Sequence, residues 1–232
     1  MKIAVLSDIH SNCYALEAVL QDVALEKPDS YIVLGDTFGY FPWAVKTFEL
    51  LKPVNPIALL GNHDKLVLDA TPPSPTPSYW SVAKHNEREL NAFVPEALDW
   101  LSELQPSLRI GFLDCDIECA HGTPDDPLNG RFYPDDTSLP AWSPGVGSVV
   151  LLGHTHYPLF RFSPQGGVIA NPGSVGQPRD GNLRASWGLL HLPSGKFEIR
   201  RTRYDVRGVI ELLDEMGWYG VAISSLKKGA SN

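Results

Sequence analysis

Short apolar runs alternate with helix-like segments through the first half of the chain. Three unbroken apolar runs, typical of buried strands, span residues 2–6, 31–34 and 57–60. Between them, apolar side chains recur at helical spacing over residues 12–26, with Asn12 as the N-cap, and a further helix is expected over residues 43–51. Strands that alternate with helices predict βαβ units and a sheet that is at least partly parallel.

Strand-like runs follow one another more closely in the second half of the chain. Helical patterns come first, over residues 79–91 and 95–104. The expected strands then span residues 107–113, 117–120, 149–152, 157–162, 167–170, 186–192 and 196–203. Turn signals between the later runs favour antiparallel, hairpin-type pairing. A last amphipathic helix is expected over residues 206–216, and the tail beyond residue 224 is expected to be loose.

Two segments fit neither regular structure. Residues 71–78 are too rich in proline for a helix or a strand, and we interpret them as a surface loop, because helical patterns resume after them without a new charge regime. Residues 121–147 hold many Pro, Asp and Gly, and a loop this long is usually functional or mobile. A chain of 232 residues with 43% hydrophobic content is therefore predicted to be a single domain over residues 1–232.

The charge of the chain narrows the class of protein. A net charge of −8 and a pI near 5.3 argue against binding to nucleic acid or anionic membranes through bulk charge, and no basic track for a long nucleic acid is visible. A phosphate substrate stays compatible with this charge, because metal ions concentrate positive charge locally. No run reaches the ~18 apolar residues of a membrane span, and no signal-peptide region precedes the strand at Lys2. We expect a cytoplasmic protein.

The three cysteines, Cys13, Cys115 and Cys119, are odd in number and lack metal-ligand spacing. We interpret them as small buried hydrophobic residues in a reducing compartment. A short apolar strand could still bring Cys115 and Cys119 near each other. The sequence therefore predicts no thiolate metal site.

Candidate metal ligands follow five of the expected strands. They stand in the stretches Asp8-Ile9-His10, Gly35-Asp36, Gly61-Asn62-His63-Asp64, His121-Gly122 and Gly153-His154-Thr155-His156. In α/β sheets, sites gather at the carboxyl ends of strands, where loops from separate segments converge. Each residue alone has an ordinary structural explanation, but five of the seven histidines stand in these stretches. Of the other two, His191 is expected to be structural, whereas His85, on a helix, could approach the substrate.

The spacing within two stretches fits the ends of strands. Asp8 and His10 are two residues apart, as are His154 and His156. On an extended backbone, residues two apart face the same side, whereas a metal-binding pair on a helix is four apart. We therefore expect both pairs to project from extended strand ends.

The types of side chain limit the metal. Three carboxylate or carboxamide groups and four imidazoles are too many for one tetrahedral ion; they are Asp8, Asp36, Asn62, His10, His121, His154 and His156. This nitrogen-rich set suits Mn²⁺, which we favour, or Fe, Ni, Co or Zn, and it disfavours Ca²⁺ and Mg²⁺. Two ions roughly 3.5–4 Å apart need a bridging ligand. Asp36 stands alone after its strand, which favours it as the bridge.

These blocks, in this order, resemble the calcineurin-like metallophosphoesterase superfamily over nearly the whole chain. The resemblance implies an α/β fold, a four-layer α/β/β/α sandwich of two mixed sheets with the site at its upper rim. It implies that Asp8, His10 and His156 hold a first metal ion, that Asn62, His121 and His154 hold a second, and that Asp36 bridges them. It also implies that His63 binds no metal and faces the leaving group.

Two further stretches bear on the substrate. Asn171-Pro172-Gly173-Ser174-Val175-Gly176, followed by Pro178-Arg179-Asp180-Gly181, is similar to the compact bacterial and archaeal phosphodiesterases of the superfamily, as is Gly39-Tyr40-Phe41-Pro42. Protein Ser/Thr phosphatases carry a second Asp and an Arg soon after the bridging Asp, where this chain has residues 37–40. The resemblance therefore implies a phosphodiesterase. The alternatives are a phosphomonoesterase, a phosphoprotein phosphatase or a dinucleoside polyphosphate hydrolase. A non-catalytic protein-binding scaffold is least expected, because all the ligands are present.

The expected mechanism follows from the metal pair. A water that bridges two cations loses its proton near neutral pH, and the resulting hydroxide attacks phosphorus in line. His63 would offset charge on the phosphoryl oxygens or donate to the leaving oxygen, and Asp64 would either orient His63 or support its surroundings. The candidate substrate contacts are Asn171, Gly173, Ser174, Arg179 and His85. The glycine-rich loop at Gly173 is equally explained as a tight turn between strands, and the sequence leaves a homo-oligomer open.

Overall fold

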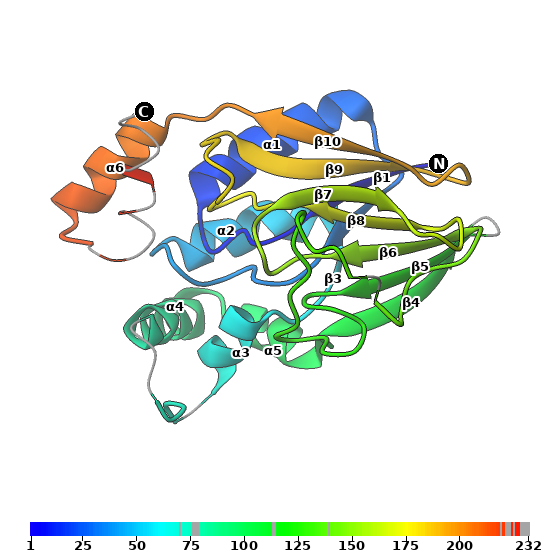
Figure 1. Ribbon diagram of the computed structural model, residues 1–232. Coiled ribbons are helices and arrows are strands. Elements are labelled where there is room, and N and C mark those ends of the chain that lie inside the picture. Colours follow the sequence, from blue (N-terminus) through cyan, green and yellow to red (C-terminus); the bar gives the residue numbers. More distant parts are fainter. Residues whose placement is uncertain are drawn as a thin grey trace.

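Two five-stranded sheets form the frame of the protein, in a computed structural model that describes residues 1–69, 71–75, 79–112, 115–138, 140–218, 220, 224 and 226–227 (Figure 1). The strands are β1 Lys2–Leu6, β2 Ser30–Val33, β3 Ile57–Ala58, β4 Ser107–Phe112, β5 Cys115–Ala120, β6 Ser148–Leu152, β7 Pro158–Phe162, β8 Val168–Pro172, β9 Ala185–His191 and β10 Lys196–Thr202. The first sheet has the order β10-β9-β1-β2-β3 and the second the order β4-β5-β6-β8-β7.

Both sheets are mixed. In the first, β1, β2 and β3 are parallel, and β9 and β10 are antiparallel additions on one side. In the second, β5, β6 and β8 are parallel, and the edge strands β4 and β7 are antiparallel to their neighbours. The predicted α/β class, the parallel core and the two mixed sheets are confirmed, as is the hairpin-type pairing of β7 with β8 and of β9 with β10.

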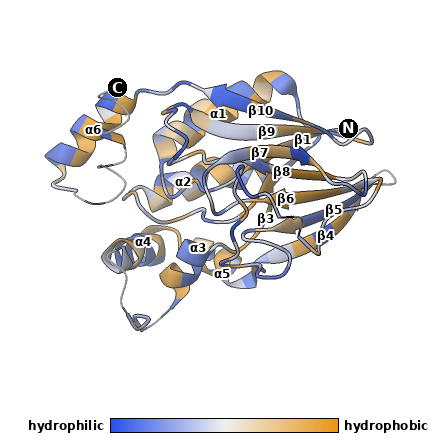
Figure 2. Cartoon of the chain, in the orientation of Figure 1, coloured by the Kyte–Doolittle hydropathy of each residue, from blue (hydrophilic) through white to orange (hydrophobic). Residues whose placement is uncertain are grey.

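The inner faces of the two sheets pack against each other. Alternate residues of β1, β5 and β6 point between the sheets, including Ile3, Ile117 and Leu151, all at most 1% exposed. Such alternation is what the two-residue period of a strand requires. Figure 2 shows hydrophobic stretches on strands in the middle of the molecule, such as β6 and β8, whereas hydrophobic and hydrophilic residues alternate along the helices.

Two of the helices, α1 Cys13–Glu26 and α2 Ala44–Leu51, pack on the outer face of the first sheet. The other helices of the described chain are α3 Asn62–Leu68, α4 Trp80–Phe93, α5 Glu96–Glu103 and α6 Val206–Glu215, with a 3-10 turn at Lys52–Val54. Leu16 and Val19 of α1 pack on the side chains of β1 and β9. The predicted N-cap is confirmed, because the Asn12 side chain accepts a hydrogen bond from the backbone N–H of Ala15 at 3.2 Å.

The outer face of the second sheet is covered differently. The resemblance to the superfamily implies a helical layer here, but the described part of segment 121–147 is irregular, as its many Pro, Asp and Gly suggest. Phe132 and Trp142 from this segment cover Val150, Leu152 and neighbouring apolar side chains of the sheet. The two inner sheets and the helical layer over the first sheet therefore follow the expected sandwich, while irregular chain forms the fourth layer.

The region of β3 and α3 differs most from the sequence-based expectation. The strand expected over residues 57–60 is only two residues long, and the helix α3 begins four residues after it, where no helix was expected. A helix of seven residues is too short to show a clear 3.6-residue period. The structure describes the expected strand over residues 107–113 as far as residue 112. Residue 113, residues 76–78 of the proline-rich stretch and most of the tail beyond 224 lie outside the described residues. None of the described helices is both long and apolar enough to cross a membrane.

The three thiols are free and buried, as predicted. Cys115 and Cys119 lie on the same strand and face the core between the sheets, and no disulfide joins them. Burial raises the pKa of Cys13 and of Cys119 to about 12. We expect the thiols of Cys13 and Cys119 to react with a chromogenic disulfide reagent at pH 8 roughly 1,000-fold more slowly in the folded protein than in guanidinium chloride, because the reactive thiolate is depleted. Rapid reaction of three thiols without denaturant would contradict this burial.

Candidate metal centre

The predicted ligands come together at the carboxyl ends of strands from both sheets. Asp8 and His10 follow β1, Asp36 follows β2, Asn62 follows β3, His121 follows β5, and His154 and His156 follow β6. The six Asp and His side chains form two groups, Asp8–His10–His156 and Asp36–His121–His154, and within each group the candidate ligand atoms lie within 4.8 Å of one another. All six are at most 7% exposed. The convergence that the sequence predicted is therefore present.

The backbone at these residues is not extended, and that part of the prediction was wrong. Five candidate ligands have positive φ: Asp8 at 52°, His10 at 53°, Asp36 at 51°, His154 at 62° and His156 at 63°. The left-handed conformation costs about 1–2 kcal/mol for each residue with a side chain. Pairs two residues apart still reach the same site, because the chain coils sharply at each strand end rather than continuing the strand. Several strained residues at one place indicate a functional constraint.

The first group is built around two imidazoles and a carboxylate. The Nε2 atoms of His10 and His156 are 3.1 Å apart, and Asp8 Oδ1 lies 3.4 Å from His156 Nε2 and 3.9 Å from His10 Nε2. The other oxygen of Asp8 accepts hydrogen bonds from Ser7 Oγ at 2.7 Å and from the backbone N–H of His154 at 3.1 Å. Asp8 thus has one oxygen fixed by the protein and one directed at the two histidines.

Asp36 joins the two groups. Its Oδ2 lies 3.6 Å from His10 Nε2 in the first group, and its Oδ1 lies 3.5 Å from His121 Nε2 in the second. In the second group, Asn62 Oδ1 is 3.1 Å from the same nitrogen of His121. A carboxylate whose two oxygens face different groups has the geometry that a bridging ligand requires.

The hydrogen bonds around the site leave lone pairs directed inward. His121 Nδ1 donates to the carbonyl oxygen of Leu34 and His156 Nδ1 to that of Gln177, both at 2.7 Å, so each ring turns an unprotonated Nε2 toward the site. Asp8 Oδ1 and His154 Nε2 are buried without a hydrogen-bond partner among the described residues. Buried acceptors without donors are rare unless a cation or other ligand serves them. The donor set therefore fits divalent transition-metal ions.

Burial favours the uncharged form of each of these groups. It raises the pKa of Asp8 to about 7 and holds that of Asp36 well above its usual value, with the nearby Asp64 carboxylate adding to the shift at Asp36. It lowers the pKa of His154 to about 3 and holds those of His10 and His156 well below their usual value. Neutral imidazoles are the metal-binding form, and nearby cations would favour the ionised form of the carboxylates.

His63 stands beside both groups at the start of α3. Its ring centroid is 4.8 Å from that of His10, and its backbone N–H donates to Asp36 Oδ1 at 2.8 Å. His10, Asp36 and His63 also form a trio within ligand-to-ligand range. Burial is the main cause that lowers the pKa of His63 to about 3, so the ring is neutral at pH 7 and keeps one N–H to donate.

Asp64 supports the loop after Asp36. Its carboxylate accepts hydrogen bonds from three backbone N–H groups, those of Thr37 at 3.2 Å, Phe38 at 2.9 Å and Gly61 at 2.9 Å. No hydrogen bond in the described structure joins it to the ring of His63. Of the two roles that the sequence left open, this geometry favours support of the surroundings.

Position 61 has no room for a side chain, so it requires glycine. A Cβ at this position would lie 2.0 Å from Asp36 Oδ1 and 2.2 Å from the backbone nitrogen of Asp36. Any side chain would displace the carboxylate that joins the two groups. The glycine in the stretch from Gly61 to Asp64 thus serves close approach of two backbone segments.

Asn86 of α4 is a site residue that the sequence patterns missed. Its Oδ1 accepts from Ser11 Oγ at 3.0 Å and from the Gly39 N–H at 2.9 Å, and its Nδ2 donates to the Phe41 carbonyl at 3.0 Å. It therefore ties the loop after His10 to the loop after Asp36. The available signal was a polar residue on the helix face that also buries Ala83 and Leu90.

Comparison with known proteins identifies the family. The family model described as calcineurin-like phosphoesterase matches residues 1–158, a range that contains all seven candidate ligands and His63. The chain belongs to the calcineurin-like phosphoesterase family. Membership implies a divalent-metal-dependent hydrolase of phosphoric esters.

Three relatives of this calcineurin-like phosphoesterase cover almost its whole length. A metallophosphoesterase from Sphaerobacter thermophilus has a crystal structure with 27% sequence identity and a TM-score of 0.78 over 99% of this chain and 100% of that one. The hypothetical protein PH1004 from Pyrococcus horikoshii OT3 shares the fold at 22% identity, with a TM-score of 0.81 over 97% of each chain. The uncharacterized protein MJ0912 from Methanocaldococcus jannaschii is 29% identical over 90% of each chain.

The predicted substrate contacts of the calcineurin-like phosphoesterase lie in two kinds of surroundings. Asn171 and Ser174 are fully buried: Asn171 Nδ2 donates to the Gly153 carbonyl at 2.7 Å, and Ser174 Oγ donates to the Asp8 carbonyl at 2.7 Å. Their polar atoms hold the ligand-bearing loops, as does the turn at Gly173, which has a φ of 77°. This geometry favours the interpretation of the loop as a tight turn.

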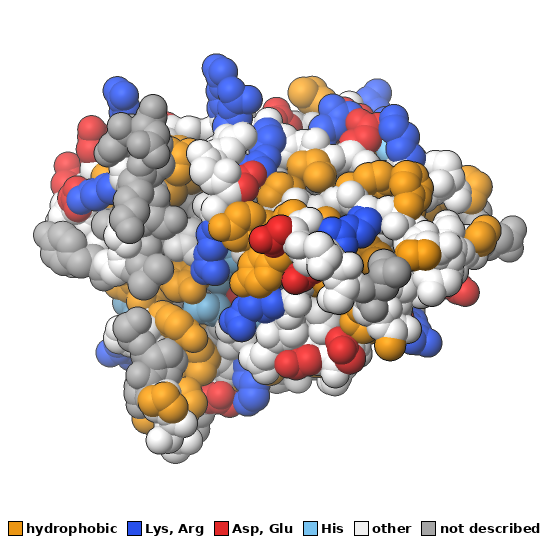
Figure 3. Space-filling view, viewed as in Figure 1, with side chains coloured by type: hydrophobic (Ala, Val, Ile, Leu, Met, Phe, Trp, Pro, Cys, Tyr) orange, Lys and Arg blue, Asp and Glu red, His pale blue; other side chains and the backbone are white. Residues whose placement is uncertain are grey.

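Arg179 and His85 are the more accessible candidates. The Arg179 side chain is exposed, whereas His85 packs its ring at 4.8 Å from that of Trp218. Figure 3 shows histidine atoms at the surface in the left half of the view, bordered by Lys or Arg and by hydrophobic side chains.

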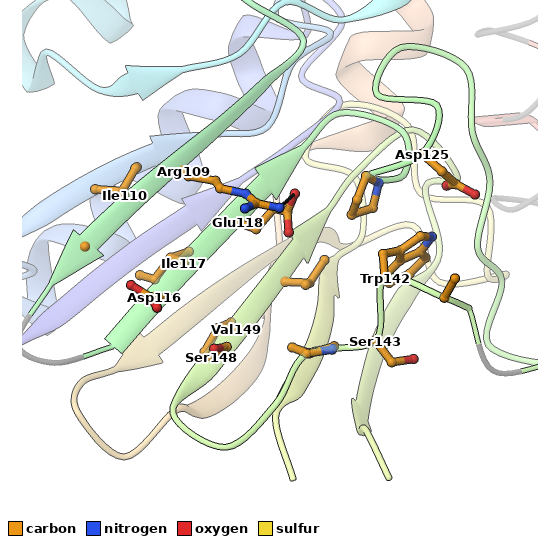
Figure 4. A pocket seen from close by; sticks show the side chains of 15 residues that line it. Arg109, Ile110, Asp116, Ile117, Glu118, Asp125, Trp142, Ser143, Ser148 and Val149 are labelled. Carbon is orange, nitrogen blue, oxygen red and sulfur yellow. Dashed lines mark hydrogen bonds and ion pairs between the residues drawn. The ribbon is translucent and has the colours of Figure 1, made fainter. Parts of the chain in front are cut away.

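A cavity lies away from the candidate metal centre. This cavity of about 780 Å³ opens on the outer face of the second sheet, between β4–β6 and the irregular segment with Trp142 (Figure 4). Its lining includes the ion pair of Arg109 with Glu118 at 2.9 Å and the start of β6 at Ser148. None of the candidate ligands of the phosphoesterase lines it, because they stand at the opposite, carboxyl ends of these strands.

Proposed function

We propose that the protein is a phosphodiesterase that works with two divalent cations. The observation that carries the proposal is the position of Asp36, whose two oxygens face His10 and His121 in different groups. In this proposal Asp8, His10 and His156 hold one ion, Asn62, His121 and His154 hold the other, and Asp36 bridges. Mn²⁺ is the expected ion, with Fe, Ni, Co and Zn as alternatives, because the donors are mainly imidazoles and carboxylates.

The chain's own residues would position the ester and stabilise its charge. The bound cations would acidify a water to supply the nucleophile and would offset negative charge on the phosphoryl oxygens. His63 would donate its remaining N–H to a phosphoryl or leaving oxygen. Asp64 and Asn86 would fix the loop after Asp36 through their backbone hydrogen bonds, so that the acceptor atoms are in place before substrate binds.

The sequence after Asp36 supports a diester substrate over a phosphoprotein. Residues 37–40 lack the second Asp and the Arg of protein phosphatases, and the loop is instead filled by Phe38, Tyr40 and Phe41, all at most 8% exposed. We further propose that the chain is one domain that acts in the cytoplasm, with the free, buried thiols as support for a reducing compartment. A homo-oligomer is compatible with these proposals.

The proposed function can be tested by metal analysis combined with activity assays. Purified protein should carry about two transition-metal ions per chain, lose activity on chelation and recover it with Mn²⁺, Ni²⁺ or Zn²⁺. Among three substrates, an aryl phosphodiester should be hydrolysed faster than the matching monoester and than diadenosine tetraphosphate. A faster monoester or tetraphosphate rate would replace the diester assignment, and one ion per active chain would remove the dinuclear mechanism.

A further inference from the structure

Arg179 forms no ion pair with a carboxylate among the described residues. Its Nη2 donates to Tyr40 Oη at 3.3 Å and to Gln177 Oε1 at 3.1 Å, and both acceptors are neutral. The neighbouring Asp180 pairs with Arg201 instead. The N–H groups on Nε and Nη1 have no partner among the described residues, so more than half of this five-donor fork is open to a ligand.

This guanidinium is tied to the metal centre from two sides. Gln177 accepts from His156 Nδ1 through its carbonyl and from Arg179 through its side chain, and the Arg179 N–H lies 3.4 Å from the His156 carbonyl. On the other side, the ring centroid of Tyr40 is 4.5 Å from those of both His10 and His63. The Arg179 guanidinium therefore contacts two residues, Gln177 and Tyr40, that themselves contact candidate ligands and His63.

Tyr40 is itself rigidly held, so its hydroxyl is a fixed point. The side chain is 8% exposed, packs against Val209 and Leu213 of α6, and has its backbone carbonyl bonded to Trp218 Nε1 at 3.1 Å. Such an anchor favours ligand binding by an exposed arginine, because the side chain then loses fewer rotamers when the ligand binds. Sequence patterns could not reveal this contact, since the two residues are 139 positions apart.

We propose that Arg179 binds a non-bridging phosphoryl oxygen of the substrate and that Tyr40 is a positioning residue that holds its guanidinium there. This inference rests on the proposed phosphoesterase function and adds a protein-borne cation to the site. Charge-assisted hydrogen bonds from a guanidinium to phosphate are among the stronger polar contacts in proteins. The alternative is a purely structural role, in which Arg179 only joins the turn after Gln177 to the loop of Tyr40.

Single and double substitutions separate these two roles. Arg179→Gln should lower kcat/KM by about 10- to 100-fold, the equivalent of one charged hydrogen bond, and Tyr40→Phe by about 2- to 10-fold, mainly through KM. Tyr40→Phe should have no further effect once Arg179 is Gln, because it acts through that residue. Arg184→Gln removes the same charge from an exposed position on the same connection and should match the wild type.

A binding measurement keeps the test independent of turnover. With metal-loaded protein, calorimetric titration of inorganic phosphate should show weaker binding for Arg179→Gln, partial recovery for Arg179→Lys and no change for Arg184→Gln, at equal metal content and melting temperature. Phosphate affinity unchanged in Arg179→Gln would overturn the inference, as would equal losses in the Gln and Lys variants. Additive effects of Tyr40→Phe and Arg179→Gln would overturn the positioning role. Wild-type protein that binds phosphate but turns over no ester would instead refute the proposed function.

Discussion

Asp36→Asn is expected to lower the metal content from about two ions per chain to one or none, and to lower turnover by at least ~1,000-fold, since each cation contributes several kcal/mol of charge stabilisation. The substitution keeps the shape of the side chain and can keep the acceptor of the His63 N–H bond. It removes the negative charge and one of the two oxygens that face His10 and His121. A neutral amide offers one oxygen and a weaker donor, so it can no longer present a negatively charged oxygen to each of the two groups.

Elemental analysis after gel filtration, with turnover of an aryl phosphodiester, measures the effect of Asp36→Asn. Asp136→Asn is the matched control, because Asp136 also accepts a backbone N–H, from Tyr133 at 2.6 Å, but belongs to the irregular segment over the second sheet. The control should keep both ions and wild-type rates. Two tightly held ions in Asp36→Asn would remove the bridging assignment.

Much of the fold follows from local patterns. The helical spacing after Asn12, the apolar runs of β1 and β2, and the closely spaced later strands were sufficient to predict the α/β class and the mixed pairing. The gathering of Asp8, Asp36 and His121 was predictable because a parallel sheet places the ends of its strands at one edge.

The backbone detail of the site was beyond such patterns. The left-handed conformations at Asp8 and His154 arise from tertiary hydrogen bonds, such as the His154 N–H to Asp8 Oδ2 bond at 3.1 Å between residues 146 positions apart. The same holds for Asn86, whose three partners lie on two other loops. Local propensity cannot encode contacts between distant segments, and functional sites are where such conflicts concentrate.

The strained strand ends and the supporting residues act together. Positive φ at Asp36 is costly in isolation, but the loop that follows it is fixed by Asp64 and Asn86 through four backbone hydrogen bonds. This arrangement holds buried acceptor atoms close together even though burial opposes their charges. Stabilising contacts elsewhere in the fold thus hold the strained backbone and the buried acceptor atoms in the arrangement that a cation site needs.

His63→Ala is expected to keep both metal ions and the fold but to lower turnover of an aryl phosphodiester by about 100- to 10,000-fold, the range for loss of a positioned proton or hydrogen-bond donor. The His63 ring lies beside the candidate ligands, and its backbone N–H, which bonds Asp36, survives the substitution. His191→Ala is the control, since His191 pairs with Glu198 at 2.9 Å on β10 and should change neither metal content nor rate. Loss of one ion in His63→Ala would make His63 a ligand, as its trio with His10 and Asp36 allows, and an unchanged rate would remove it from the mechanism.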